Sequence, residues 1–94
     1  MGIQAFDAPI LSDSITVNSI GVVIDCDVIK STYYEFLFDN IGDNQAQIEL
    51  GGTIIKLEKS KFIIIRQTDV ESVKIKSNDG TQIFYVFQGA RKIT

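Results

Sequence analysis

Three short segments of this chain are apolar at both odd and even positions, and they constrain its fold more than any other feature. The segments are Tyr33–Phe38, Phe62–Ile65 and Ile83–Phe87. Successive side chains of a β-strand point to opposite sides, so a strand with one face in water should alternate apolar and polar residues. A chain of 94 residues can form two packed layers, in which each strand keeps an outer face in water. We therefore expect more apolar strand surface than one copy can bury.

Turn residues separate the remaining candidate strands. Gly51-Gly52 predicts a two-residue hairpin turn, since glycine adopts a positive φ without a steric penalty. Ser77–Gly80 predicts another turn. Ile15–Val17 and Val22–Ile24 are rich in β-branched residues and are interpreted either as one strand bulged at Gly21 or as a hairpin. The other expected strands are Ala46–Leu50, Thr53–Leu57 and Val70–Lys76.

The rhythm of strands and turns predicts the fold class. No segment places apolar residues at helical spacing over three turns, so we expect little helix. Seven to eight short strands with a turn about every 8–12 residues predict an all-β fold, an antiparallel β-sandwich of jelly-roll-like or Ig-like type. Residues 14–94 are assigned to a single sandwich domain. Residues 1–13 are assigned to an extended N-terminal arm, since Pro9 forbids a regular strand or helix interior. The arm either frays or docks, and its four large apolar residues favour docking.

Composition is typical of a globular domain. The chain is 45% hydrophobic and 22% charged, and it lacks any run of about 18 apolar residues, so we expect no membrane span. The N-terminus lacks the basic and apolar regions of a secretory signal. Cys26 is the only cysteine, so no intrachain disulfide can form, which fits a reducing compartment.

Charge is divided unequally along the chain. Residues 1–50 hold eight acidic residues and one basic residue, whereas residues 51–94 hold eight basic and four acidic residues. The two halves could attract each other within one fold or between neighbouring copies, or the charges could simply solvate the strand surfaces. The net charge is −3 and the basic residues are scattered, so nucleic acid is not an expected partner.

The absence of histidine excludes several kinds of active site. Ser-His-Asp and Cys-His catalysis lose their base, and the common catalytic zinc sites lose their ligands. A single cysteine cannot supply an all-thiolate zinc site or hold an iron–sulfur cluster. We therefore expect no catalytic residues, no cofactor and no small-molecule substrate, and we interpret the chain as a protein that is not an enzyme.

One acidic pair leaves carboxylate chemistry open. Asp25 and Asp27 lie two residues apart and could serve as the acid and base of a small hydrolase. We favour the interpretation that both face water at a strand end while Cys26 packs inward as a small hydrophobic residue.

The turn Asp39–Asn44 leaves a calcium site open. It offers oxygen ligands, but Asp39 and Asp43 are four residues apart and do not match the signature of a calcium loop. Asparagine, aspartate and glycine are also typical of any tight turn, so we predict no metal ligands here.

The aromatic residues offer a different function. Tyr33, Tyr34 or Tyr85 could stack a sugar, which would make the chain a ligand- or carbohydrate-binding β module. Acidic residues border Tyr33–Phe38 and would repel a nucleic-acid backbone. Core packing or a subunit interface accounts for the aromatic residues better.

The order of segments from Phe36 to Phe87 resembles that of small accessory structural proteins of bacteriophage virions. The order is a strand with an Asn-containing turn, a Gly-turn hairpin, a charged turn and further short strands. The matching segments are Phe36–Asn40, Gln47–Ile54, Leu57–Phe62, Val73–Lys76 and Asp79–Thr81. The resemblance implies a sandwich that decorates a capsid, seats a head fibre or forms a tail ring. It also implies location in the virion after assembly in the host cytoplasm, and otherwise a cytoplasmic protein.

Our leading hypothesis is therefore a non-enzymatic structural subunit of a virus or phage particle, either an auxiliary capsid protein or a tail protein. It would assemble as a homo-oligomer or with other virion proteins through apolar strand faces and its N-terminal arm, without nucleic acid or membrane. The predicted subunit-interface residues are Ile3, Phe6, Ile10, Leu11, Tyr34, Ile64, Tyr85 and Phe87. The alternative is the ligand- or carbohydrate-binding β module.

Overall fold

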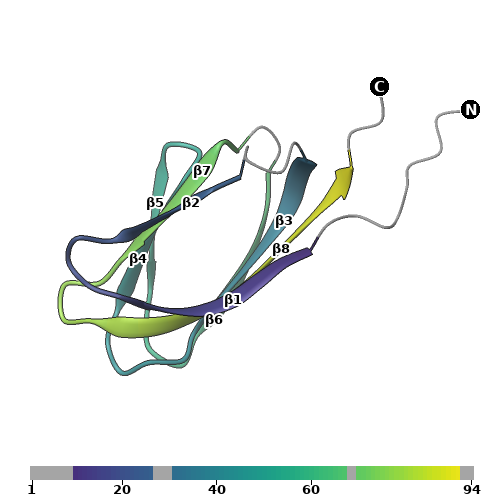
Figure 1. Ribbon diagram of the computed structural model, residues 1–94. Helices are drawn as coiled ribbons and strands as arrows, with labels where there is room; N and C mark the ends of the chain where they lie inside the picture. Colours follow the sequence, from purple (N-terminus) through teal and green to yellow (C-terminus); the bar gives the residue numbers. More distant parts are fainter. Residues whose placement is uncertain (1–9, 27–30, 68–69, 92–94) are drawn as a thin grey trace, which may run out of the picture.

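Two facing β-sheets make up the structure, a computed structural model that describes residues 10–26, 31–67 and 70–91 (Figure 1). For residues 10, 31–34, 90 and 91 only the backbone is described. The described part of the chain contains eight strands and no helix that could cross a membrane. The strands are β1 (Ile10–Val17), β2 (Val22–Asp25), β3 (Ser31–Asn40), β4 (Ala46–Leu50), β5 (Thr53–Leu57), β6 (Phe62–Arg66), β7 (Ser72–Lys76) and β8 (Thr81–Arg91).

The strands form two antiparallel sheets of four. Sheet A has the order β1-β8-β3-β6, and sheet B has the order β2-β7-β4-β5. Among the described strands that follow each other in the chain, only β4 and β5 pair as a hairpin, and each other connection passes from one sheet to the other. The predicted antiparallel β-sandwich of seven to eight strands is confirmed, with crossings typical of a jelly roll.

The segment between β1 and β2 carries the chain from sheet A to sheet B. The Oδ1 atom of Asn18 accepts hydrogen bonds from the backbone N–H groups of Ile20 and Gly21, at 3.0 and 3.3 Å. Gly21 has a φ of 91°, a conformation that favours glycine. This turn separates Ile15–Val17 from Val22–Ile24 and sends them to different sheets. Both interpretations of these segments, one bulged strand or a hairpin, are therefore wrong.

Strand β1 begins within the segment assigned to the N-terminal arm. The backbone of Ile10 pairs with that of Gln88, and Leu11 pairs with Phe87. The Leu11 side chain is half-buried and packs against the core. Residues 1–9 lie outside the described residues, so the division into an arm and one sandwich domain stays a prediction.

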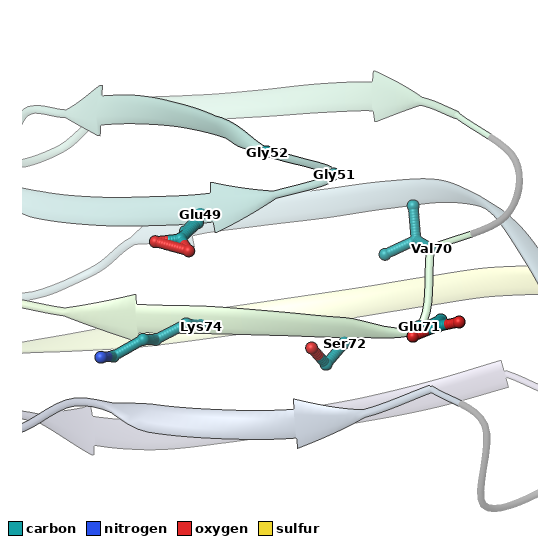
Figure 2. A pocket seen from close by; sticks show the side chains of 7 residues that line it. All are labelled: Glu49, Gly51, Gly52, Val70, Glu71, Ser72 and Lys74. Atoms are coloured by element: carbon teal, nitrogen blue, oxygen red, sulfur yellow. The ribbon is translucent and has the colours of Figure 1, made fainter.

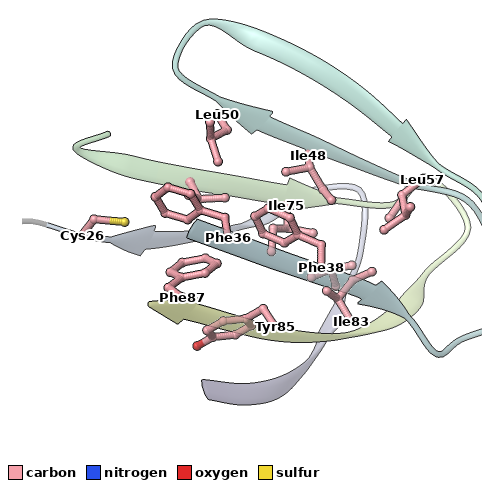
Figure 3. Close-up of a cluster of buried hydrophobic side chains, with 13 residues drawn as sticks. Cys26, Phe36, Phe38, Ile48, Leu50, Leu57, Ile75, Ile83, Tyr85 and Phe87 are labelled. Carbon is pink, nitrogen blue, oxygen red and sulfur yellow. The ribbon is translucent and has the colours of Figure 1, made fainter. Parts of the chain in front are cut away.

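The core lies between the two sheets and is built from the inward-facing half of the apolar segments (Figure 3). Phe36, Phe38 and Phe87 of sheet A are fully buried. The ring of Phe87 meets the other two edge-on, with centroid separations of 4.9 and 5.5 Å. Sheet B contributes the opposing side chains Ile48, Leu50, Val73 and Ile75.

The outer face of sheet A carries the other half of the same segments. The register of β8, β3 and β6 brings Val86, Leu37 and Ile64 into one row, and in the next row Phe84 and Phe62 stand on either side of Asp39. Phe62 is 66% exposed and Ile64 is 48% exposed. We call these five apolar residues the apolar face. One copy of the chain leaves this face in contact with water, as the sequence pattern predicts.

A buried asparagine ties the end of β3 to neighbouring segments. The side-chain amide of Asn40 donates hydrogen bonds to the carbonyl oxygens of Asn44 and Leu57, at 2.8 and 3.0 Å. Its Oδ1 atom accepts from the Thr81 hydroxyl at 2.8 Å and from the Gly42 N–H at 3.2 Å. Asn40 is fully buried, and each polar group of its amide has a partner, as burial requires.

Ionisation of the buried Tyr85 hydroxyl is expected to lower the free energy of unfolding in alkaline solution. Burial raises the pKa of Tyr85 above its usual 10.0, and the carboxylate of Asp13, its cross-strand partner, raises it further. The folded state then keeps a proton that the unfolded chain loses. Stability should therefore be unaffected below pH 10 and should fall as the pH rises from there through the folded-state pKa. Urea unfolding at stepped alkaline pH should show this fall, and Tyr85→Phe should reduce it; an equal fall in that variant would contradict the assignment.

Candidate functional site

An open groove lies on the outer surface of sheet B, at the end that carries the turn between β4 and β5 (Figure 2). Its volume is about 280 Å³. The backbone of the turn forms one wall, and side chains of β4, β7 and the segment before β7 form the rest. The lining residues are Glu49, Gly51, Gly52, Val70, Glu71, Ser72 and Lys74.

Two glycines shape the wall of the groove. Gly51 and Gly52 have φ angles of 56° and 83°, as a two-residue hairpin with positive φ at both positions requires. The side-chain amide of Gln67 lies against Gly51 where a β-carbon would stand, whereas the space beside Gly52 is open. The hairpin predicted from the two glycines is confirmed. The two glycines themselves contribute no side chain to this wall.

The strand register places the polar side chains of the groove on one surface. Glu49 of β4 is the cross-strand partner of Lys74 of β7, and Ser72 lies two residues before Lys74 on the same face. All three are exposed. Neither Glu49 nor Lys74 forms an ion pair with any residue that the structure describes. Their polar groups can therefore serve a ligand.

The groove offers hydrogen-bonding groups on four polar side chains. Its carboxylates accept hydrogen bonds, the ammonium group of Lys74 donates them, and the hydroxyl of Ser72 does both. The half-buried Val70 adds an apolar contact. No histidine stands beside Ser72 to act as a general base, because the chain has none.

The space between the sheets does not fit a metal ion. Aromatic and aliphatic side chains fill it around Phe36, Phe38 and Phe87. Among the residues that the structure describes, no three His, Cys, Asp or Glu side chains lie together. The sequence contains no histidine, the usual nitrogen ligand of such sites. We therefore assign no reaction step to a metal.

The acidic candidates of the sequence analysis do not form a site in the described residues. Asp25 is exposed at the end of β2, Cys26 is buried, and Asp27 lies outside the described residues. Asp39 lies on the outer face of sheet A, whereas Asp43 is exposed in the loop before β4. Among the described residues, no group of three His, Cys, Asp or Glu side chains includes Asp25, Asp39 or Asp43.

The predicted interface residues lie in different surroundings. Tyr85 and Phe87 face the core, because alternation along β8 turns both positions inward, so they are not available to a neighbouring copy. Leu11 packs against the core, and Ile64 is exposed on the outer face of sheet A. The interface assignment of Ile64 stays a prediction. Four predicted contacts lie outside the described residues, namely Ile3 and Phe6 and the side chains of Ile10 and Tyr34.

A tyrosine platform for sugar stacking is not seen in the described side chains. Tyr85 is only 6% exposed. The side chains of Tyr33 and Tyr34 lie outside the described residues. Binding of a sugar in the groove would therefore depend on hydrogen bonds, because its lining residues include no aromatic side chain.

Comparison with known proteins identifies the architecture. Neither a protein-family model nor a curated protein sequence matches this chain. An RmlC-like cupin from Shewanella frigidimarina is 13% identical and has a TM-score of 0.56, over 88% of this chain and 68% of the cupin. The fold is cupin-like. The putative ethanolamine utilization protein Q of Salmonella typhimurium is 9% identical, with a TM-score of 0.59 over 86% of this chain and 58% of that protein. The Cnp3 cupin domain of Schizosaccharomyces pombe is 11% identical, with a TM-score of 0.55 over 85% and 52%.

These comparisons correct the expected function. The similar structures are cupins from cellular organisms, so the resemblance to accessory proteins of phage virions is wrong. The role as a structural subunit of a virion, the virion partners and the location in the virion are wrong with it. The segments quoted for that resemblance describe only an order of strands and turns, which unrelated β-sandwiches share. At these identities the cupin likeness shows the fold alone, and the fold is compatible with an enzyme or with a protein that is not one.

Sequence reasoning did not find the groove. Alternation in Ala46–Leu50 and Val70–Lys76 predicts that Glu49, Ser72 and Lys74 face outward, which the structure confirms. The pairing of β4 with β7 brings these residues together. Two other strands separate β4 from β7 in the chain, so no short sequence pattern predicts that these strands pair.

Proposed function

We propose that this chain is a non-catalytic ligand-binding β module that binds a small polyhydroxylated molecule, such as a saccharide, in the groove. The observation that carries the proposal is the groove itself. Exposed donors and acceptors stand on two paired strands, beside a turn that has no side chains. The cupin-like fold supports the proposal, because jelly rolls also serve as lectin domains.

The charges of the groove favour a neutral ligand over an anionic one. Two carboxylates, Glu49 and Glu71, face one ammonium group, that of Lys74, so the groove carries a net charge of −1 (−2 + 1). Phosphate or carboxylate groups would be repelled. The hydroxyl groups of a saccharide can donate to the carboxylates and accept from the ammonium. The groove is open to water, which competes for these bonds, so we expect weak affinity in about the millimolar range.

We propose binding without catalysis because the chain lacks chemical groups on which common enzymatic reactions depend. Metal-assisted hydrolysis needs a group of metal ligands, thiol chemistry needs an activated cysteine, and acyl transfer by a serine most often uses a histidine as its base. The sequence has no histidine, and its one cysteine is buried in the core. The groove therefore supports binding better than turnover.

A saccharide titration followed by amide NMR tests the proposal. A panel of neutral monosaccharides and disaccharides is added to the labelled full chain. At least one should give saturable shifts that concentrate in residues 49–52 and 70–74, because these residues line the groove. A panel without saturable shifts there would overturn the proposal.

Two charge-neutral double variants sharpen the saccharide test. Replacing Glu49 and Lys74 by alanine removes an acceptor and a donor of the groove, and should weaken binding about tenfold or more. The matched control replaces Glu58 and Lys59, an exposed Glu and Lys in the turn before β6 at the other end of the hairpin. The control should keep the affinity of the native chain. Equal loss in both variants would show that the groove does not hold the ligand.

A further inference from the structure

We propose that the binding site continues along the outer face of sheet B and that its ligand is an acidic saccharide. A second hollow adjoins the groove there and would take the acid group, such as the carboxylate of a uronic acid. The lysines around Gln47 and the side-chain amide of that residue carry this inference, which rests on the proposed function and names the class of saccharide bound.

The second hollow lies beside the groove on the same surface. Its volume is about 50 Å³, and its lining residues are Gln47, Glu49, Ile54, Lys74 and Lys76. Glu49 and Lys74 also line the groove, so the two spaces meet at this cross-strand pair. From Gln47 to the turn at Gly51 the chain advances four residues, or about 14 Å. One extended ligand can therefore occupy both spaces.

Three lysines surround Gln47. The register places Gln47 of β4 between Lys76 of β7 and Lys56 of β5, in one row across the sheet. Lys74 belongs to the next row, but its side chain leans along β7 away from the turn between β4 and β5 (Figure 2). Its Cε atom and the Cβ atom of Lys76 both lie 3.2 Å from the position that a β-carbon on Gly21 would take. The three positive charges are therefore gathered at one end of the site.

The three lysines have bonding capacity for a ligand. None of them forms an ion pair or a side-chain hydrogen bond with the described part of the chain. Of the described residues that line the second hollow, only Glu49 is acidic, so with Lys74 and Lys76 the lining has a net charge of +1 (+2 − 1). Lys56 adds a further positive charge beside it. The second hollow therefore attracts an acid group, whereas the groove repels one.

The side-chain amide of Gln47 gives the second hollow a directed hydrogen-bond donor. Gln47 is half-buried, and its side chain makes no hydrogen bond with any residue that the structure describes. A ligand can restore the hydrogen bonds to water that such an amide loses on burial. Its NH₂ group would donate to the carboxylate that the ammonium groups attract. On the far side of this row, the carboxylate of Glu58 accepts a hydrogen bond from the amide of Gln45, and the site ends there.

The size of the second hollow fits one acid group rather than a whole sugar ring. At about 10–15 Å³ for each water, its 50 Å³ would hold about three to five waters, which is space for a carboxylate and little more. The ring that carries the acid would lie over Glu49 and its cross-strand partner Ile54. Ile54 is 64% exposed and offers that ring an apolar contact.

Matched pairs of disaccharides, followed by amide NMR of the full chain, test the inference. Each neutral disaccharide of a panel is compared with its counterpart in which one hydroxymethyl group is a carboxylate. At least one acidic member should bind about tenfold more tightly than its neutral partner, because it gains two or three charge contacts. Both members should shift residues 49–52, and only the acidic one should also shift residues 56 and 76 and the side-chain amide of Gln47.

The outcomes separate the acidic ligand from the proposed function. Equal affinities within every pair, without a shift of the Gln47 side-chain amide, would overturn the acidic ligand and leave the groove as a saccharide site. Saturable shifts with none of the compounds would overturn both. Shifts confined to residues 47, 56 and 76 would show an anion held apart from the groove, and would overturn the continuous site.

Two double variants test which lysines hold the acid group. Replacing Lys56 and Lys76 by glutamine should bring the affinity ratio of the acidic to the neutral ligand close to one. The matched control replaces Lys59 and Lys61, two exposed lysines in the turn before β6, and should keep the ratio of the native chain. In the native chain the ratio should also fall between about 0.05 and about 0.5 M salt, which screens exposed charges. Equal ratios in the two variants would overturn the assignment of the acid group to this end of the site.

Discussion

Replacing Phe87 with alanine is expected to lower the free energy of unfolding by about 3–5 kcal/mol. Phe87 is fully buried, and its ring contacts Phe36, Phe38 and Tyr85 at centroid distances of 4.9, 5.5 and 4.9 Å. The substitution removes these contacts and leaves a cavity between the sheets. Because small domains are stable by only about 5–15 kcal/mol, much of the variant should be unfolded at moderate urea concentration.

Urea unfolding followed by circular dichroism measures the effect of the Phe87 substitution. The control is Phe84→Ala, the same substitution three residues earlier in β8 but on the outer face, where the side chain is half-buried. It should cost less than about 2 kcal/mol, since little cavity is left. Equal losses at the two positions would contradict the burial that the structure assigns to Phe87.

Replacing Asn40 with alanine is the second change with a large expected effect, a loss of about 3 kcal/mol or more. The Asn40 side chain bonds to the carbonyls of Asn44 and Leu57, the Thr81 hydroxyl and the Gly42 N–H. Alanine would remove the hydrogen-bond partner of these four groups, which lie largely out of contact with water. Thermal and urea unfolding measure the loss, and Asn78→Ala, an exposed asparagine in the loop before β8, should change stability little.

An aspartate at the same position separates the hydrogen bonds of Asn40 from its volume. Asn40→Asp keeps the shape of the side chain but turns an oxygen toward the carbonyls of Asn44 and Leu57. The charged form is then disfavoured in the folded state, so the new carboxyl should have a raised pKa. The variant should be least destabilised below about pH 4 and should lose stability as the pH rises above that value. A loss of stability that is the same at all pH values would contradict the two carbonyl contacts.

Local signals in the sequence are enough to predict individual strands and turns. The hairpin at Gly51-Gly52 is predicted correctly because positive φ at both positions depends on the two glycines themselves. The alternation in Ala46–Leu50 is also local, and its inward residues Ile48 and Leu50 are buried. The all-β class and the number of strands follow from such segments.

In the segments that are apolar on both faces, the sequence does not show which side chains are buried. In Ile83–Phe87 alternation alone does not say which residues face the core. The sequence prediction places Tyr85 and Phe87 at an interface, yet both are buried, and the outer positions Phe84 and Val86 lie on the apolar face. The choice depends on pairing with strands far away in the chain.

The roles of Asn40 and of the groove residues could not be predicted from the sequence, because these residues also depend on distant strand pairing. Asn40 looks like an ordinary turn residue in the sequence, because its partners Leu57 and Thr81 lie far away in the chain. The groove also depends on distant pairing, since β4 and β7 bring Glu49 and Lys74 together. The function inferred from the order of segments was wrong because that order contains neither pairing.

The position of β8 in sheet A has a consequence for biosynthesis. This strand is the last of the described strands to leave the ribosome, yet it lies between β1 and β3 and bonds to both along its length. Until it emerges, β1 has no neighbour in its sheet and the aromatic rings of β3 lack Phe87 to pack against. The nascent polypeptide therefore cannot complete sheet A before residues 81–91 are synthesised, and until then the apolar side chains of β1 and β3 lack their partner strand.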